Sequence, residues 1–132
     1  MRMSRCFPEP VQEMAVYRLH RGVDYRDVAD AHILASETRK TKKIDVFVIS
    51  GKTPFLKSDE EQLLKNPEAV IRKRHPLLAS EFDKRNWKFP GSIDRVYDSS
   101  YAKKKLGWEP KRSCLDVIEQ FDNEDYETLP NT

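Results

Sequence analysis

The sequence has few of the residues that mark a secreted or metal-binding protein. It contains two cysteines, Cys6 and Cys114, which lie far apart and form neither a CxxC pair nor a Cys/His spacing. We find no signal-peptide pattern and no long apolar run. A soluble protein in a reducing, cytoplasmic setting is therefore expected, with no membrane partner.

Glycine is also scarce. The four glycines stand at positions 22, 51, 91 and 107, and they do not form the GxxGxxG turn with which a dinucleotide-binding fold approaches a pyrophosphate. We therefore expect neither NAD(P) nor another dinucleotide to bind this chain alone.

Charge of one sign is not in excess. The chain has 24 basic and 22 acidic residues, which leave a net charge of +2. Its basic clusters, at 39–43, 72–74 and 103–105, are small, and aromatic residues are not interleaved with them. Nucleic-acid binders usually carry a larger one-sided surplus. Nucleic acid is therefore not an expected partner.

The length and composition of the chain suit one folded domain. Charged residues make up 35% of the 132 residues and hydrophobic residues 38%, which is polar but sufficient for a core. The segment 122–132 is rich in acids and poor in apolar residues, so we expect a disordered tail there. The sequence thus predicts a domain over residues 1–121 and a tail over 122–132.

The strongest strand pattern is Ile44–Ile49, where apolar side chains fill five of six positions. Such a run predicts a strand with both faces covered, as in a parallel sheet. Ile93–Tyr97 is a second extended candidate, Met1–Phe7 a possible short strand, and Gln12–Arg21 irregular or briefly helical. The expected fold class is α/β, with short parallel-type strands and covering helices.

Local signals predict the helices. Asp27 is placed to cap a helix through Glu37, and Ser58 with Glu61 forms a capping-box pattern. Pro67 suits the first turn of a restarted helix. Three further helices are expected: Pro76–Arg85, Ser99–Leu106 with a left-handed cap at Gly107, and one opened by Ser113 with Asp116.

The segment from Arg95 to Phe121 resembles the closing signature of the NAD-dependent epimerase/dehydratases, in the extended short-chain dehydrogenase/reductase family. In that family a strand leads into a capped helix that ends at Leu-Gly-Trp, and a Pro then leads into a terminal helix opened by Ser. The residues that match are Asp98, Ser99, Ala102, Leu106, Gly107, Trp108, Pro110 and Ser113.

Three earlier blocks resemble the same family in the same order. Arg21–Glu37 is similar to a segment that crosses the substrate cleft into a helix, and Asp45–Gly51 to the strand that follows. Arg2–Pro10 is the loosest match. The resemblance implies the C-terminal, substrate-binding portion of a sugar-nucleotide epimerase or dehydratase. It also implies NAD(P) as the cofactor of the complete enzyme, because hydride transfer needs it.

The parts of that enzyme that perform chemistry are not in this sequence. The family's proton relay uses a Tyr with a Lys four residues later, on a helix that would precede residue 1. Tyr101 and Lys105 have this spacing but fall inside the closing signature, on what the family has as an outer helix. We therefore expect no catalytic residue in this chain.

Substrate contacts are the roles left to assign. The family commonly grips the diphosphate with an Arg just before the closing strand. That position falls near Phe89 here, so Lys88 and Arg95 are the nearest candidates, and Arg5 and Phe7 are candidates in the first block.

The remaining titratable residues are expected to be structural. His20, His32 and His75 are scattered and define no metal site. Cys6 and Cys114 have no His near them in sequence and are expected to be inert.

Without its front half, the apolar segment Ile44–Ile49 would be left uncovered, so we expect self-association or a partner chain. Two other interpretations remain open. The chain can be a non-enzymatic protein-interaction or regulatory module derived from such an enzyme, or a small nucleic-acid binder that uses its basic clusters.

Overall fold

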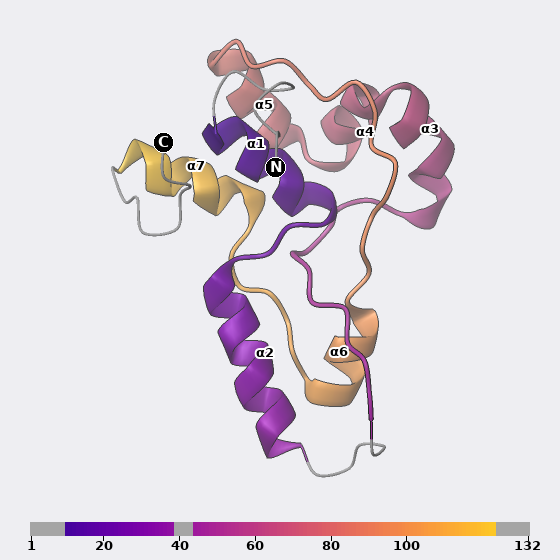
Figure 1. Ribbon diagram of the computed structural model, residues 1–132. Helices are drawn as coiled ribbons and strands as arrows, with labels where there is room; N and C mark the ends of the chain where they lie inside the picture. The colour runs from indigo at the N-terminus through magenta and orange to yellow at the C-terminus, as the bar shows by residue number, and fades with distance from the viewer. Residues whose placement is uncertain (1–9, 39–43, 124–132) are drawn as a thin grey trace.

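The computed structural model describes residues 10–38 and 44–123, and within them the secondary structure is helical (Figure 1). In these described residues, seven α-helices and one short 3-10 turn follow one another. Their bounds are α1 Pro10–His20, α2 Tyr25–Glu37, the 3-10 turn η1 Lys57–Asp59, α3 Glu60–Lys65, α4 Pro67–Arg74, α5 Pro76–Lys84, α6 Ser100–Leu106 and α7 Cys114–Asp122.

The expected α/β fold with parallel strands is wrong for the described residues. They are 61% helical and contain no strand or sheet. A strand requires a hydrogen-bonded neighbour, and none lies beside 44–49 in the part of the chain that the structure describes. The segment is covered on one side only: Phe47 and Ile49 pack inward, whereas Ile44, Val46 and Val48 are 83%, 78% and 45% exposed.

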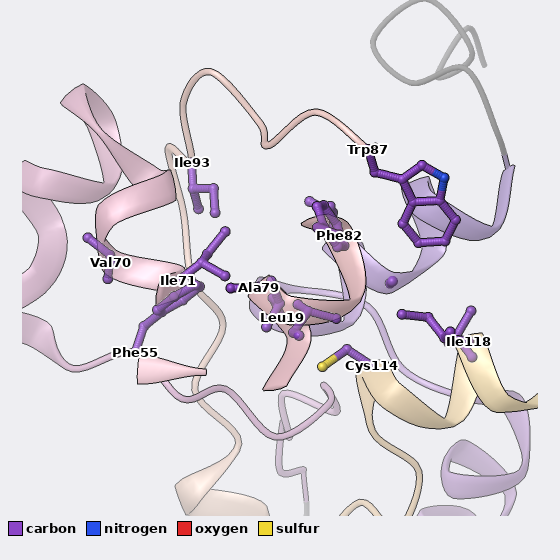
Figure 2. Packing of buried hydrophobic residues seen from close by; sticks show 14 of the residues in the cluster. Leu19, Phe55, Val70, Ile71, Ala79, Phe82, Trp87, Ile93, Cys114 and Ile118 are labelled. Atoms are coloured by element: carbon purple, nitrogen blue, oxygen red, sulfur yellow. The ribbon is translucent and has the colours of Figure 1, made fainter. Parts of the chain in front are cut away.

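The larger of two hydrophobic clusters lies where α1, α4, α5 and α7 meet the segment that follows α5. Figure 2 shows Phe82 beside Trp87, and their rings are 5.4 Å apart in an edge-to-face arrangement. Leu19 of α1 and Ile118 of α7 belong to the same cluster. Burying such side chains contributes about 1.5 to 3 kcal/mol each, so this cluster is the main source of stability.

The smaller cluster joins α2 to α6, in the lower part of Figure 1. Ala31, Ala102, Leu106 and Trp108 are buried in it. The loop after α6 is therefore packed against a helix that lies far from it in the sequence.

Several helix ends are where local signals predicted them. Ser113 and Asp116 form a capping box at the start of α7, and Gly107 ends α6 with φ of 68°. Asn66 caps α4, whose first residue is Pro67. The helix expected over Pro76–Arg85 is α5.

Other boundaries differ from the expectation. The segment expected to be irregular or briefly helical forms the three-turn helix α1. Asp24, not Asp27, caps α2. Ser58 lies inside η1 and does not open a helix. At this turn the Asp59 carboxylate accepts a hydrogen bond from the Leu56 amide. The possible strand at 1–7 lies outside the described residues, and so does the expected tail at 122–132 from residue 124 onward. Asp122, the first residue of that tail, is the last residue of α7.

A close main-chain contact fixes the centre of the molecule. The amide of Gly51 donates to the carbonyl oxygen of Gly22 at 2.6 Å. A Cβ at Gly51 would lie 2.7 Å from that oxygen, so any other residue would push the two segments apart. The residues after α1 and the segment 44–52 therefore meet at this point.

No helix among residues 10–38 and 44–123 is both long and apolar enough to cross a bilayer.

Candidate substrate groove

A groove of about 670 Å³ opens between the start of the α3 region and the segment 93–98. Phe55, Leu56, Leu63 and Leu64 form much of one wall, and residues 93–98 form the other. Apolar side chains therefore make up much of the groove lining, which also contains charged side chains.

The wall formed by 93–98 is held by hydrogen bonds to three separate parts of the chain. The Ile93 amide donates to the Leu63 carbonyl oxygen at 2.8 Å, and the Tyr97 amide donates to the His20 carbonyl oxygen at 2.7 Å. The Ser50 hydroxyl donates to the Tyr97 carbonyl oxygen at 3.4 Å. The groove is thus assembled from segments that are distant in sequence.

Arg95 is the predicted substrate residue that lies at this groove. Its side chain is 54% exposed and pairs with the Asp94 carboxylate at 3.0 Å. The hydrogen bond from Arg95 lowers the pKa of Asp94. Lys57 adds a second cation, but Glu60, Asp94 and Asp98 add three carboxylates to the same lining. Part of the charge of Arg95 is therefore already balanced by neighbouring carboxylates.

A smaller hollow of about 290 Å³ adjoins the groove and shares Thr53, Tyr97 and Asp98 with it. Ser99 and Ser100 add hydroxyl groups to its lining, which suits a ligand with several hydroxyls.

Lys88, a second predicted site residue, does not lie at the groove. Lys88 is exposed and lines neither hollow. Its carbonyl oxygen instead accepts a hydrogen bond from Nε2 of Gln12 at 2.6 Å, which ties the loop after α5 to α1. Arg5 and Phe7 lie outside the described residues.

Tyr101 and Lys105 do not form a proton relay. The Tyr101 hydroxyl donates to the Asp45 carboxylate at 2.9 Å, and this hydrogen bond raises the pKa of Tyr101. A relay needs the opposite shift, toward a phenolate. The Lys105 ammonium lies 6.0 Å from the centre of the Tyr101 ring, and the ring stacks on Phe47. The geometry fits a surface packing role.

The buried Cys114 and the half-buried His75 meet at the starts of α7 and α5. The sulfur of Cys114 lies 3.4 Å from Nε2 of His75. Burial raises the pKa of the Cys114 thiol to about 11 and lowers the pKa of His75. The pair is therefore neutral near pH 7, unlike the thiolate–imidazolium pair of a nucleophile. Sequence reasoning missed it because the two residues are far apart in the chain.

A buried ionic cluster lies between α1 and α2, and the sequence analysis did not anticipate it. Asp24 pairs with Arg18 at 2.8 Å and with Arg26 at 2.9 Å. Burial alone would raise the pKa of Asp24, but hydrogen bonds from Arg26 and the charge of Arg18 lower it to about 2. The position of Asp24 just before a helix is the one local signal that could have pointed to it.

Groups of three or more His, Cys, Asp or Glu side chains suited to a metal ion are not found among the described residues. Comparison of the chain with protein-family models, with curated proteins and with solved structures finds no match.

Proposed function

We propose that this chain is the substrate-binding portion of an NAD(P)-dependent sugar-nucleotide epimerase or dehydratase, and that it is not catalytic alone. The observation that supports the proposal most is the contact between two of the blocks that resemble the family. The Trp108 indole donates to the Asp27 carbonyl oxygen at 2.8 Å, and the Asp27 carboxylate accepts from the Arg112 guanidinium at 2.7 Å.

A third block joins the same unit. Gly51, which ends the block at 45–51, contacts Gly22 at the start of the block at 21–37. Ser50 of the same block donates to Tyr97, which lies on the groove wall. Three blocks that resemble one family thus pack together beside the groove, as parts of one substrate site would.

In this proposal Arg95 contacts the diphosphate of the nucleotide, and the apolar side chains of the groove contact uncharged parts of the ligand. NAD(P) is bound by a companion polypeptide, in a cytoplasmic setting. The companion covers Ile44, Val46 and Val48, whose exposed side chains form an apolar patch on one side of 44–49. Without the companion, we expect two copies of the chain to associate through this patch.

A second candidate is a non-enzymatic protein-interaction module derived from such an enzyme. The charges of the groove favour it, because the lining has more carboxylates than cations and Arg95 is already paired with Asp94. A diphosphate would meet repulsion as well as attraction there.

The test is titration of the purified chain with UDP, UDP-glucose and NAD⁺, followed by NMR of its amide groups. The proposal expects saturable shifts at residues 93–98 with UDP and UDP-glucose, and none with NAD⁺. Arg95→Ala should weaken UDP binding by about tenfold or more, because it removes a charge-assisted hydrogen bond. Lys88→Ala, outside the groove, is the matched control. If the chain is folded but millimolar UDP shifts none of its amide signals, the protein-interaction module would be favoured.

Self-association through the apolar patch is tested separately by light scattering. The proposal expects a concentration-dependent increase in mass for the wild-type chain and a monomer for Val46→Lys, which places a charge in the apolar patch. A wild-type monomer at high concentration would contradict self-association.

A further inference from the structure

Helix α1 ends at His20, and this residue contacts the groove wall through two different groups. Its carbonyl oxygen accepts a hydrogen bond from the Tyr97 amide at 2.7 Å. Its ring nitrogen Nδ1 lies 3.1 Å from the carbonyl oxygen of Arg95. A carbonyl oxygen can only accept, so Nδ1 carries the proton in this contact.

The His20 side chain is buried, with 7% of its surface exposed. Its ring stacks on Tyr17, with 5.6 Å between the ring centres. The charged groups that face it are Arg21, which directly follows α1, and Asp94 and Arg95 on the groove wall. The imidazole therefore has a fixed orientation, and it contacts the groove wall at Arg95, whose side chain is exposed.

Between its two ends the groove wall is supported by Val96, which packs against the larger hydrophobic cluster. Ile93 is tied to Leu63 and Tyr97 to Ser50, but 94–96 belongs to no helix or sheet. The hydrogen bond from His20 Nδ1 holds the main chain at Arg95, in the middle of this segment. The direction in which Arg95 leaves the wall depends on that carbonyl, because the side chain and the carbonyl are attached to the same Cα atom.

We propose that His20 is a positioning residue for the groove: its Nδ1–H holds the main chain of Arg95 so that the guanidinium faces a bound anion. The inference rests on the groove being the ligand site of the proposed function. His20 does not touch the ligand itself and acts through Arg95.

Two substitutions separate this role from simple packing. His20→Asn places an amide nitrogen near the position of Nδ1 and can keep the hydrogen bond to Arg95. His20→Phe keeps the ring and its contact with Tyr17 but has no donor. Both substitutions keep the His20 carbonyl oxygen, so the hydrogen bond from the Tyr97 amide can still form. The end of the wall at Tyr97 should therefore stay close to His20, while the main chain at Arg95 becomes more mobile in His20→Phe.

The experiment compares wild type, His20→Asn and His20→Phe by amide hydrogen exchange and by UDP titration. We expect His20→Phe to increase exchange at the Tyr97 amide, the hydrogen-bonded amide within 95–97, by about tenfold or more while core amides of α4 stay unchanged, and His20→Asn to restore protection. We expect UDP affinity to fall several-fold in His20→Phe and to recover in His20→Asn.

Equal exchange at 95–97 in all three proteins would overturn the inference, and so would a uniform increase across the molecule in His20→Phe. If His20→Phe does not fold, His20→Gln replaces it, because its amide nitrogen lies near the Nε2 position and should not restore the contact. If wild type binds no UDP, the proposed function fails, and exchange at 95–97 still decides whether His20 positions the wall.

Discussion

The indole nitrogen of Trp108 donates a hydrogen bond to the carbonyl oxygen of Asp27 at 2.8 Å, across 81 positions of the chain. The Asp27 side chain, which is fully buried, accepts hydrogen bonds from the amides of Lys111 and Arg112 at 3.1 Å. One residue of α2 therefore organises the whole turn between α6 and α7. That turn sets where α7 begins, and α7 packs directly against α1.

Removal of the Asp27 carboxylate should destabilise the protein. Asp27→Ala leaves two amides and the Arg112 guanidinium without their acceptor, so we expect a loss of about 3 kcal/mol in the free energy of unfolding. The measurement is urea denaturation at pH 7. Asp30→Ala is the control, because Asp30 is partly exposed and its ion pair with Lys111 is long, at 3.6 Å. Similar losses in both variants would contradict the role given to Asp27.

The stability of the protein should fall in acid partly through Asp24. The pKa of Asp24 is about 2 in the folded chain, below its ordinary 3.8. The ionised carboxylate therefore stabilises the fold fully above about pH 4, and this contribution is lost as the pH falls from 4 toward 2, by about 2 kcal/mol.

The measurement for Asp24 is urea denaturation at several pH values for wild type and Asp24→Asn. We expect Asp24→Asn to be less stable at pH 7 and to lose less stability between pH 4 and 2. Parallel pH profiles for the two proteins would show that Asp24 does not titrate in this window.

The helices were more predictable from the sequence than the rest of the fold. Ser113 with Asp116 and Gly107 each act within one turn, so the sequence nearby contains the whole signal. The helix α1 was harder to predict because it buries polar residues. Gln12 and His20 find their hydrogen-bond partners in 88–95, far along the chain.

The segment 44–49 shows the opposite case. Its apolar run is a valid strand pattern, but a strand also needs a neighbour, and local sequence does not contain one. The candidate site was predictable only in part for a similar reason. Arg95 was predicted and lies at the groove, whereas the opposite wall around Leu56 and Leu64 depends on tertiary packing.

Cys114 should react slowly with thiol reagents while the protein is folded. Burial raises its pKa to about 11, so the thiolate fraction at pH 8 is about a hundredfold lower than for an ordinary cysteine. The measurement is labelling by iodoacetamide at pH 8 in a Cys6→Ser variant, where Cys114 is the remaining thiol. We expect slow labelling in buffer and rapid labelling in urea. Rapid labelling of the folded protein would contradict the neutral Cys114–His75 pair.

Gly51 should be intolerant of even one added methyl group. A Cβ there would lie 2.7 Å from the Gly22 oxygen and 3.1 Å from the Arg18 oxygen, and neither main-chain atom can move without disturbing α1 or the link to α2. We expect Gly51→Ala to lower the free energy of unfolding by about 1 to 3 kcal/mol. Gly91→Ala is the matched control, because a Cβ there meets no atom within 4 Å, and the change should be neutral or slightly stabilising. Urea denaturation of both variants measures the difference.

Because Ser50, the neighbour of Gly51, donates to Tyr97, Gly51→Ala should also weaken UDP binding, and Gly91→Ala should not. Equal stability of the two variants would show that the contact between Gly22 and Gly51 does not hold these segments together.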